Sequence, residues 1–72
     1  MTNDVLTLLE NNLRKHLLVS FSDGTVTECM FYGFSYDYDE SGNEILELDF
    51  ERTSDKAIFC TTPEEIESVS VD

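Results

Sequence analysis

The sequence predicts a mainly β domain, in which an N-terminal α-helix precedes a five-stranded, strongly bent antiparallel barrel. Three observations predict this fold. Apolar residues recur at helical spacing near the N-terminus, they alternate with polar residues along the rest of the chain, and turn-forming pairs divide that alternating part into short segments. A chain of 72 residues forms one small domain, 1–72, which buries about 60% of its unfolded surface.

The helix is expected over residues 3–15. Thr2 or Asn3 caps its start, and Asp4 suits the positive end of the helix dipole. Residues 14–16 are all basic or histidine and fall in the expected last turn, where cations are favourable. The apolar residues at helical spacing are Val5, Leu6, Leu9, Leu13 and Leu17.

The first two strands are expected at residues 17–22 and 25–38. Asp23 and Gly24 between them form a strong hairpin signal, because glycine accepts a positive φ angle. Gly33, in the middle of the second strand, predicts a bulge or a sharp bend. A strand this long in a small domain must curl, so its two ends are expected to pair with different neighbours.

The last three strands are expected at residues 44–52, 56–61 and 67–71. In the third strand an apolar face alternates with an acidic solvent face. Pro63 after Thr62 predicts a single helical turn before the last strand, whose Val69 and Val71 are expected to point inward. Antiparallel strands joined in this way predict a small closed barrel, which leaves no exposed strand edge.

The chain is strongly acidic. Sixteen acidic residues and four basic ones give a net charge of −12, which repels anionic membranes and phosphate backbones and favours cationic partners. No apolar run is long enough to span a bilayer, and Asp4 stands where a secretory signal carries basic residues. We therefore expect a cytoplasmic protein that does not bind membranes.

The densest acidic stretch also carries tyrosines, and it is the predicted partner-binding site. Between Asp37 and Glu51 there are seven acids and no base. They are interpreted either as a solubilising surface alone or as a face that docks on a basic protein, with Tyr36 and Tyr38 as exposed aromatic anchors. The predicted site residues are Tyr36, Asp37, Tyr38, Asp39, Glu40, Glu44, Glu47, Asp49 and Glu51.

The same stretch contains half of a calcium-loop pattern. Asp37, Asp39 and Ser41 alternate as the first ligands of such a loop do, and Gly42 follows them. The position of the bidentate glutamate is occupied by Leu48, which cannot bind a cation. The sequence therefore favours a solvated hairpin turn, and we expect no metal and no cofactor.

Catalytic and nucleic-acid-binding patterns are weak. His16 is the only histidine, and Cys29 and Cys60 lie far apart in the sequence, as expected for two buried thiols. A disulfide linking two strands is the alternative. The aromatic residues of the second strand alternate with acids rather than bases, which argues against stacking on nucleic acid. We therefore expect a protein that is not an enzyme.

The leading helix, the segment "LLVSFSDGTVTECMFYGF" and the closing "TPEEIESVSV" resemble the Sm-like group of SH3-type barrels. The Asp-x-x-x-Asn loop and the basic-Gly step of RNA-binding Sm proteins are replaced here by Ser41-Gly42-Asn43 and "CTTPEE". The resemblance therefore implies the fold without RNA contacts.

A functional analogy comes from the first hairpin. "HLLVSFSDGTVTE" is similar to that of the Rof family, the Rho-binding antiterminators, which are acidic barrels with a leading helix. This resemblance implies a small regulator or inhibitor of a basic, nucleic-acid-handling protein. The alternative is a structural Sm-like subunit that forms homo-oligomers through its strand edges.

Overall fold

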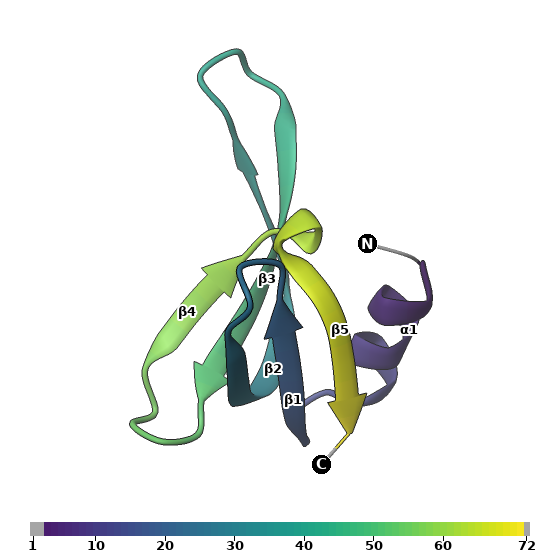
Figure 1. Ribbon diagram of the computed structural model, residues 1–72. Coiled ribbons are helices and arrows are strands. Elements are labelled where there is room, and N and C mark those ends of the chain that lie inside the picture. The colour runs from purple at the N-terminus through teal and green to yellow at the C-terminus, as the bar shows by residue number, and fades with distance from the viewer. Residues whose placement is uncertain (1–2, 72) are drawn as a thin grey trace.

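The computed structural model describes residues 3–71, which form one short helix and a five-stranded antiparallel sheet (Figure 1). This confirms the predicted mainly β class and the order of the elements. The bounds are α1 (Asn3–Asn11), β1 (His16–Phe21), β2 (Val26–Tyr38), β3 (Glu44–Arg52), β4 (Ile58–Thr61), the single 3₁₀ turn η1 (Pro63–Glu65) and β5 (Ile66–Val71).

The helix ends four residues earlier than predicted. The backbone N–H of Asn12 bonds the Leu9 carbonyl at 3.1 Å, and its side-chain amide bonds the Leu8 carbonyl at 2.7 Å, so the last turn closes there. Arg14 then adopts a positive φ of 61° and donates its N–H to the Phe31 carbonyl. The prediction of a basic last turn is therefore wrong. Thr2, the other predicted cap, lies outside the described residues.

Both glycine turns form three-residue hairpins. Gly24 (φ 94°) and Gly42 (φ 83°) each donate a backbone N–H to the carbonyl three residues earlier, with distances of 3.0 Å. Glycine is required there because the last loop residue of such a hairpin takes a left-handed conformation. The Asp23 carboxylate adds a 2.9 Å bond from the Thr25 N–H. The first two predicted turns are therefore confirmed.

The second strand bends at Gly33 as predicted. The pairing of β2 with β3 shifts by one residue between Phe31 and Gly33, where the φ of Gly33 is 152°. Before the bend, residues 26–30 pair with β1, and residues 29–38 pair with β3. The long strand thus serves two neighbours, and this curls the sheet around its core.

The closed barrel, in contrast, does not form. The strand order is β4-β3-β2-β1-β5, and within residues 3–71 no backbone pairing joins β4 to β5, so both remain sheet edges. The chain between these strands forms η1. The Glu65 carbonyl of η1 accepts a 2.8 Å hydrogen bond from the Ser22 N–H. The Thr61 hydroxyl also donates to the Glu65 carboxylate.

Aromatic side chains, rather than a backbone ladder, connect the two sides of the curled sheet. The rings follow one another with centroid distances of 5.1, 5.3, 5.4 and 6.3 Å, and the last of these contacts joins β4 to β1. In this order the rings are Phe34, Phe31, Phe50, Phe59 and Phe21. All five phenylalanines of the chain therefore form one continuous series.

The core lies between the curled sheet and α1, which runs beside β5 (Figure 1). Its buried members are Leu9, Leu17, Val19, Cys29, Phe31, Leu48, Phe50 and Ile66. Val69 packs against this cluster as predicted, whereas Val71 is exposed at the end of β5, so that part of the prediction is wrong. Within residues 3–71 no helix combines the length and apolarity needed to cross a membrane.

Candidate functional site

The most prominent surface feature is a hairpin that extends beyond the rest of the sheet. The pairing of β3 with β4 stops at Leu48, so residues 35–47 of β2, its turn and β3 pair only with one another. Figure 1 shows these two strands rising together above the other elements to a loop at the top. We call residues 35–47 the projecting hairpin.

Strand register divides the predicted site residues between two faces. Tyr36 is paired with Leu46 and Tyr38 with Glu44, so these four residues share one face, which we call the tyrosine face. The next residues along each strand point the opposite way and form the acidic face, whose carboxylates are those of Asp37, Glu47, Asp49 and Glu51. The predicted mixed patch is therefore two surfaces back to back, with Asp39 and Glu40 at the turn.

The tyrosine face is open to solvent. The exposed fractions of Tyr36 and Tyr38 are 63% and 64%, as expected for the pair near the hairpin end. Phe34 continues the same face toward the core, and its ring contacts Phe31 edge-on. An aromatic strip thus runs from the core to the hairpin turn. Its outer two rings, Tyr36 and Tyr38, are not part of the buried core.

Carboxylates dominate the acidic face, and half-buried Ile45, which pairs with Asp37, is an apolar member of it. Asp49 accepts a 3.3 Å hydrogen bond from the Ser35 hydroxyl, and Glu51 accepts one from the Tyr32 hydroxyl. This bond is the main cause of a raised pKa for Tyr32. The guanidinium of Arg14 lies 5.7 Å from the centre of the Tyr32 ring, so a positive charge lies beside the Tyr32–Glu51 end of the acidic face.

Cys60 joins the acidic face, which the sequence did not predict. It pairs with Asp49 across the β3–β4 ladder and is exposed, so the expectation of two buried thiols is wrong for this residue. The negative charge of Glu47 is the largest cause of a raised pKa of the Cys60 thiol. Cys29 is buried as expected, and burial raises its pKa to about 11.

The stretch that resembles half of a calcium loop forms a turn whose hydrogen bonds are made within the turn itself. Asp39 Oδ1 accepts the backbone N–H groups of Ser41 at 2.9 Å and Asn43 at 2.8 Å, and Oδ2 accepts the Asn43 side-chain amide. The bond from the Asn43 N–H is the main reason that the pKa of Asp39 is lowered. Within residues 3–71 no group of three potential metal ligands gathers. Asp39 thus stabilises the turn of the projecting hairpin.

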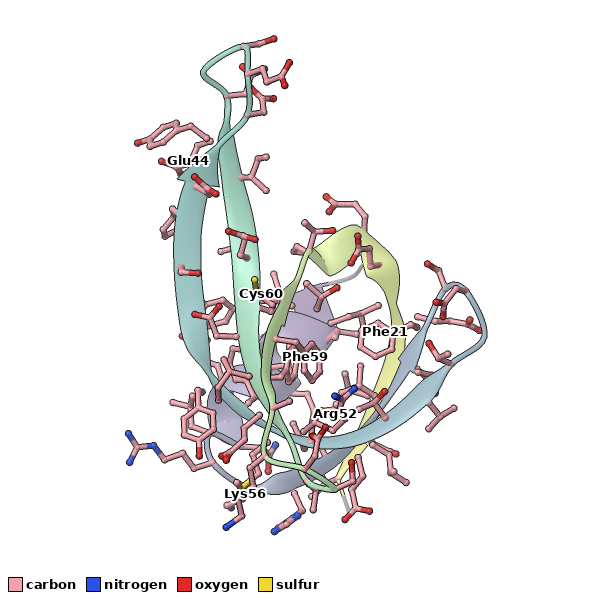
Figure 2. All side chains as sticks on the ribbon, turned by 90° about the vertical axis from the view of Figure 1, so that its left-hand side faces the viewer. Phe21, Glu44, Arg52, Lys56, Phe59 and Cys60 are labelled. Atoms are coloured by element: carbon pink, nitrogen blue, oxygen red, sulfur yellow. The ribbon has the colours of Figure 1, made fainter. Side chains whose placement is uncertain are left out.

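A second feature, also missed from the sequence, lies where the sheet fails to close. A cavity of about 540 Å³ opens between β4 and the β1–β2 turn. Figure 2 shows the side chains of Phe21, Phe59 and Arg52 directed toward this opening. These residues are distant in the sequence, and only the curl of the sheet brings them together.

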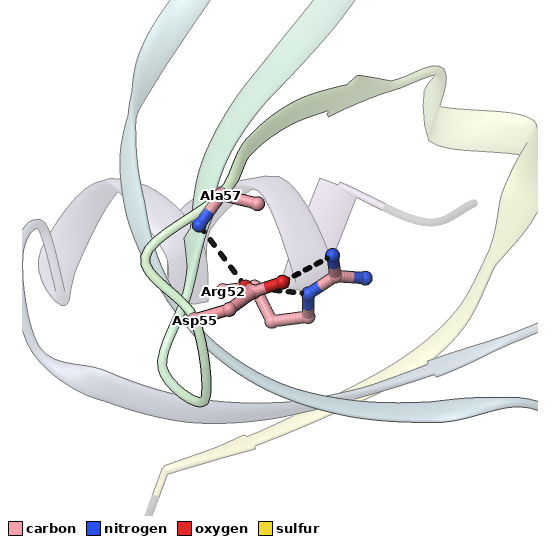
Figure 3. Close-up of polar contacts among 3 residues, drawn as sticks. All are labelled: Arg52, Asp55 and Ala57. Atoms are coloured by element: carbon pink, nitrogen blue, oxygen red, sulfur yellow. Dashed lines mark hydrogen bonds and ion pairs between the residues drawn. The ribbon is translucent and has the colours of Figure 1, made fainter.

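Arg52 is held by its own hairpin. Its Nε and Nη2 atoms donate to the two carboxylate oxygens of Asp55 at 2.9 and 2.8 Å, and Asp55 also accepts the Ala57 N–H at 3.1 Å (Figure 3). The hydrogen bond from Arg52 is the largest reason that the pKa of Asp55 falls to about 2. The charge of Arg52 is therefore balanced by Asp55.

Charges are segregated along the molecule. Glu44 lies near the end of the projecting hairpin, whereas Arg52 and Lys56 lie toward the opposite end (Figure 2). His16 is also away from the hairpin, at the start of β1, where its Nδ1 is 3.8 Å from a Glu28 carboxylate oxygen. The projecting hairpin is therefore the most negative region of the domain.

Comparisons with known proteins identify no relative of this chain. No family model matches the chain, and neither the curated proteins nor the solved structures contain a match to it.

Proposed function

We propose that this protein is a non-catalytic, acidic protein-interaction module that acts in the cytoplasm. Its projecting hairpin docks on a basic surface of a nucleic-acid-handling protein and regulates or inhibits that protein. In this proposal the domain belongs to the Sm-like, SH3-type class of small barrels. No cofactor and no direct nucleic-acid contact take part.

The observation that carries the proposal is the pair of exposed tyrosines on a hairpin that stands free of the sheet. Tyr36 and Tyr38 do not contribute to the buried core, yet aromatic side chains are the commonest anchors of protein interfaces. Their strand positions are held by β-pairing with residues 44 and 46, so little conformational entropy is lost when a partner covers them.

Charge supplies the specificity for a basic partner. The domain carries a net charge of −12, and the projecting hairpin contains acidic residues but no basic residue. Such a field accelerates association with a cationic surface and disfavours a phosphate backbone. A partner that handles nucleic acids has the matching basic groove, and occupying this groove would inhibit nucleic-acid binding.

The Sm-like assignment is supported by the arrangement of elements. A leading helix, a β2 strand bent at Gly33 and one 3₁₀ turn between β4 and β5 accompany the five antiparallel strands. These features agree with the class that the first hairpin and the closing segment resemble. The acidity agrees with the antiterminator analogy.

The test compares proteins captured from a cell lysate by immobilised wild type and by the double variant Tyr36→Ser/Tyr38→Ser. We expect wild type to retain a basic protein that is released at high salt, and the double variant to retain at least about tenfold less, as for loss of two anchors. Tyr32→Ser is the matched control, because Tyr32 lies on the opposite face. Equal retention by all three proteins, or retention insensitive to salt, contradicts the proposal.

A second candidate function is a structural subunit that forms homo-oligomers through strand edges. The unpaired edges of β4 and β5 favour it, because free edges are templates for pairing with another chain. Repulsion between copies of charge −12 opposes it. The molecular mass in solution at several salt concentrations separates the two functions: a ring persists at low salt, whereas the interaction module is a monomer.

A further inference from the structure

The free edge of β4 presents unused backbone hydrogen-bonding groups. The Arg52 N–H donates to the Ala57 carbonyl at 2.8 Å, which sets the alternation of the β3–β4 ladder. Phe59 and Thr61 then pair inward with β3, so the N–H and C=O groups of Ile58 and Cys60 point away from the sheet. Both residues are exposed, Ile58 to 70%.

The cavity beside this edge has the size and lining of a side-chain pocket. Its volume of about 540 Å³ falls within the range of ligand pockets, about 300–1,000 Å³. Phe21 and Phe59 supply apolar surface, and Asp23 and Glu65 supply carboxylates. Among the lining residues within 3–71, Arg52 is the only cation, and its charge is balanced by the bidentate pair with Asp55.

Carboxylates flank the edge on its other side as well. Asp49 lies directly across the ladder from Cys60, and Glu47 lies two residues along the same strand face. The raised pKa of the Cys60 thiol has Glu47 as its first cause and Asp49 as a further one, so the potential at this edge is negative. A strand added beside β4 would therefore meet carboxylates on both of its faces.

We propose that the free edge of β4 binds an extended, cationic segment of a partner protein as an additional β-strand. The backbone of that segment bonds Ile58 and Cys60. Lysine or arginine side chains on one of its faces meet Glu47 and Asp49. Apolar side chains on its other face enter the cavity lined by Phe21 and Phe59.

A cationic segment fits this edge better than a second copy of the chain. A second copy offers two edge strands, β5, which carries Glu67, and β4, which lies beside Glu47 and Asp49, and both belong to a molecule of charge −12. Two such surfaces repel each other, whereas a basic segment is attracted. The inference rests on the proposed function in that the partner is basic, but it uses the edge of β4 and the acidic face beside it, and not the tyrosine face of the projecting hairpin.

The probe is a labelled eight-residue peptide of alternating lysine and valine, titrated into the full chain. We expect saturable binding, and the amide hydrogens of Ile58 and Cys60 are expected to exchange at least about tenfold more slowly in the complex, because strand addition protects them. The same peptide N-methylated at alternate residues, on the edge that faces β4, keeps its charge but loses those bonds. We expect it to bind at least about tenfold more weakly.

A protein variant gives an independent reading. Ile58→Pro removes one outward N–H without removing a β3–β4 bond, since proline is tolerated at such edge positions, and is expected to weaken peptide binding at least about tenfold. Ile58→Ala is the matched control and keeps the N–H. The melting temperature of each variant reports whether it folds, and the methylated peptide remains decisive if Ile58→Pro does not fold.

Equal binding of both peptides, or unprotected Ile58 and Cys60 amides in the complex, would overturn the inference and indicate a purely electrostatic contact. The double variant Tyr36→Ser/Tyr38→Ser is expected to bind the peptide like wild type. If this variant loses its lysate partner while the peptide shows no strand addition, the proposed function stands and the edge inference fails. If the peptide adds to β4 but no lysate protein depends on the tyrosines, the reverse holds.

Discussion

At the scale of single residues, strand register decides which chemistry each side chain acquires. Cys60 is an isolated cysteine in the sequence, but its position opposite Asp49 places the sulfur among carboxylates. Asp39 shows the opposite case, because its carboxylate is used entirely by the turn that contains it. Neighbours in space thus determine whether an acidic or thiol group remains available.

The environment of Cys60 predicts slow alkylation that depends on charge. Because the thiolate is the nucleophile and Glu47 is the first cause of the raised pKa, Glu47→Gln should lower that pKa and increase the thiolate fraction. At pH 8 we expect iodoacetamide to react faster with Glu47→Gln than with wild type, because a larger fraction of Cys60 is then thiolate.

The pH dependence of this reaction has a defined direction. The alkylation rate should keep rising above pH 9, which is the ordinary pKa of a thiol. Glu47→Gln should shift the curve of rate against pH to lower pH. The control variant Glu64→Gln, on η1, should leave the rate unchanged, and mass spectrometry should show Cys29 unlabelled because it is buried. Identical rates for wild type and Glu47→Gln would show that Glu47 does not act on the thiol.

At the scale of secondary-structure elements, the helix illustrates what spacing predicts and what it leaves open. The apolar spacing correctly indicates a helix, and Leu9 is fully buried in the core. The same spacing extends to Leu13, which is 47% exposed because the chain has already left the helix. The last turn of α1 closes through the bonds of Asn12 to the Leu9 and Leu8 carbonyls, and the Arg14 N–H then bonds the Phe31 carbonyl, a tertiary contact that has no signature in the local sequence.

The two leucines therefore provide a matched pair of variants. Leu9→Ala should lower the free energy of unfolding by about 2–5 kcal/mol, because it leaves a cavity in the core between α1 and the sheet. Leu13→Ala should lower it by less than about 1 kcal/mol, the usual range for an exposed position. Urea unfolding followed by circular dichroism measures both, and equal effects would contradict the placement of α1.

At the scale of the whole molecule, net charge and strand edges determine behaviour in solution. A charge of −12 on a single small domain favours expansion through self-repulsion, and the edges of β4 and β5 are open to pairing. In our proposal, the repulsion that weakens the fold also disfavours pairing of these edges between copies of the same chain, and it leaves β4 available to a cationic partner.

This balance predicts that salt stabilises the fold. Raising sodium chloride from about 0.01 M to about 0.15 M shortens the screening length from about 30 Å to about 8 Å. We expect the melting temperature to rise by roughly 4–8 °C, the shift that corresponds to about 1 kcal/mol in a domain of this size.

A charge variant provides the control for this effect. Glu40→Lys/Glu44→Lys changes the charge by +2 at each position and reduces the net negative charge from −12 to −8. Both residues are exposed at or beside the hairpin turn, so the core is untouched. Its melting temperature should respond less to salt than that of wild type. An equal response would mean that self-repulsion is not the cause.

The sequence by itself determined the mainly β class, the order of the elements, the two glycine hairpins and the bend at Gly33. These features are local: they follow from side-chain periodicity and from backbone angles that glycine adopts easily. It also determined which residues carry the negative charge, and it correctly indicated that Tyr36 and Tyr38 are exposed.

Only the tertiary structure decided the end of the helix, the open edges of β4 and β5 and the separation of the tyrosine face from the acidic face. It also placed Cys60 among carboxylates and formed the cavity that Phe21 and Phe59 line. The physical reason is that each of these features depends on register and curl, which bring together residues distant along the chain. Periodicity predicts that a strand has two faces, but pairing with its neighbours decides what each face meets.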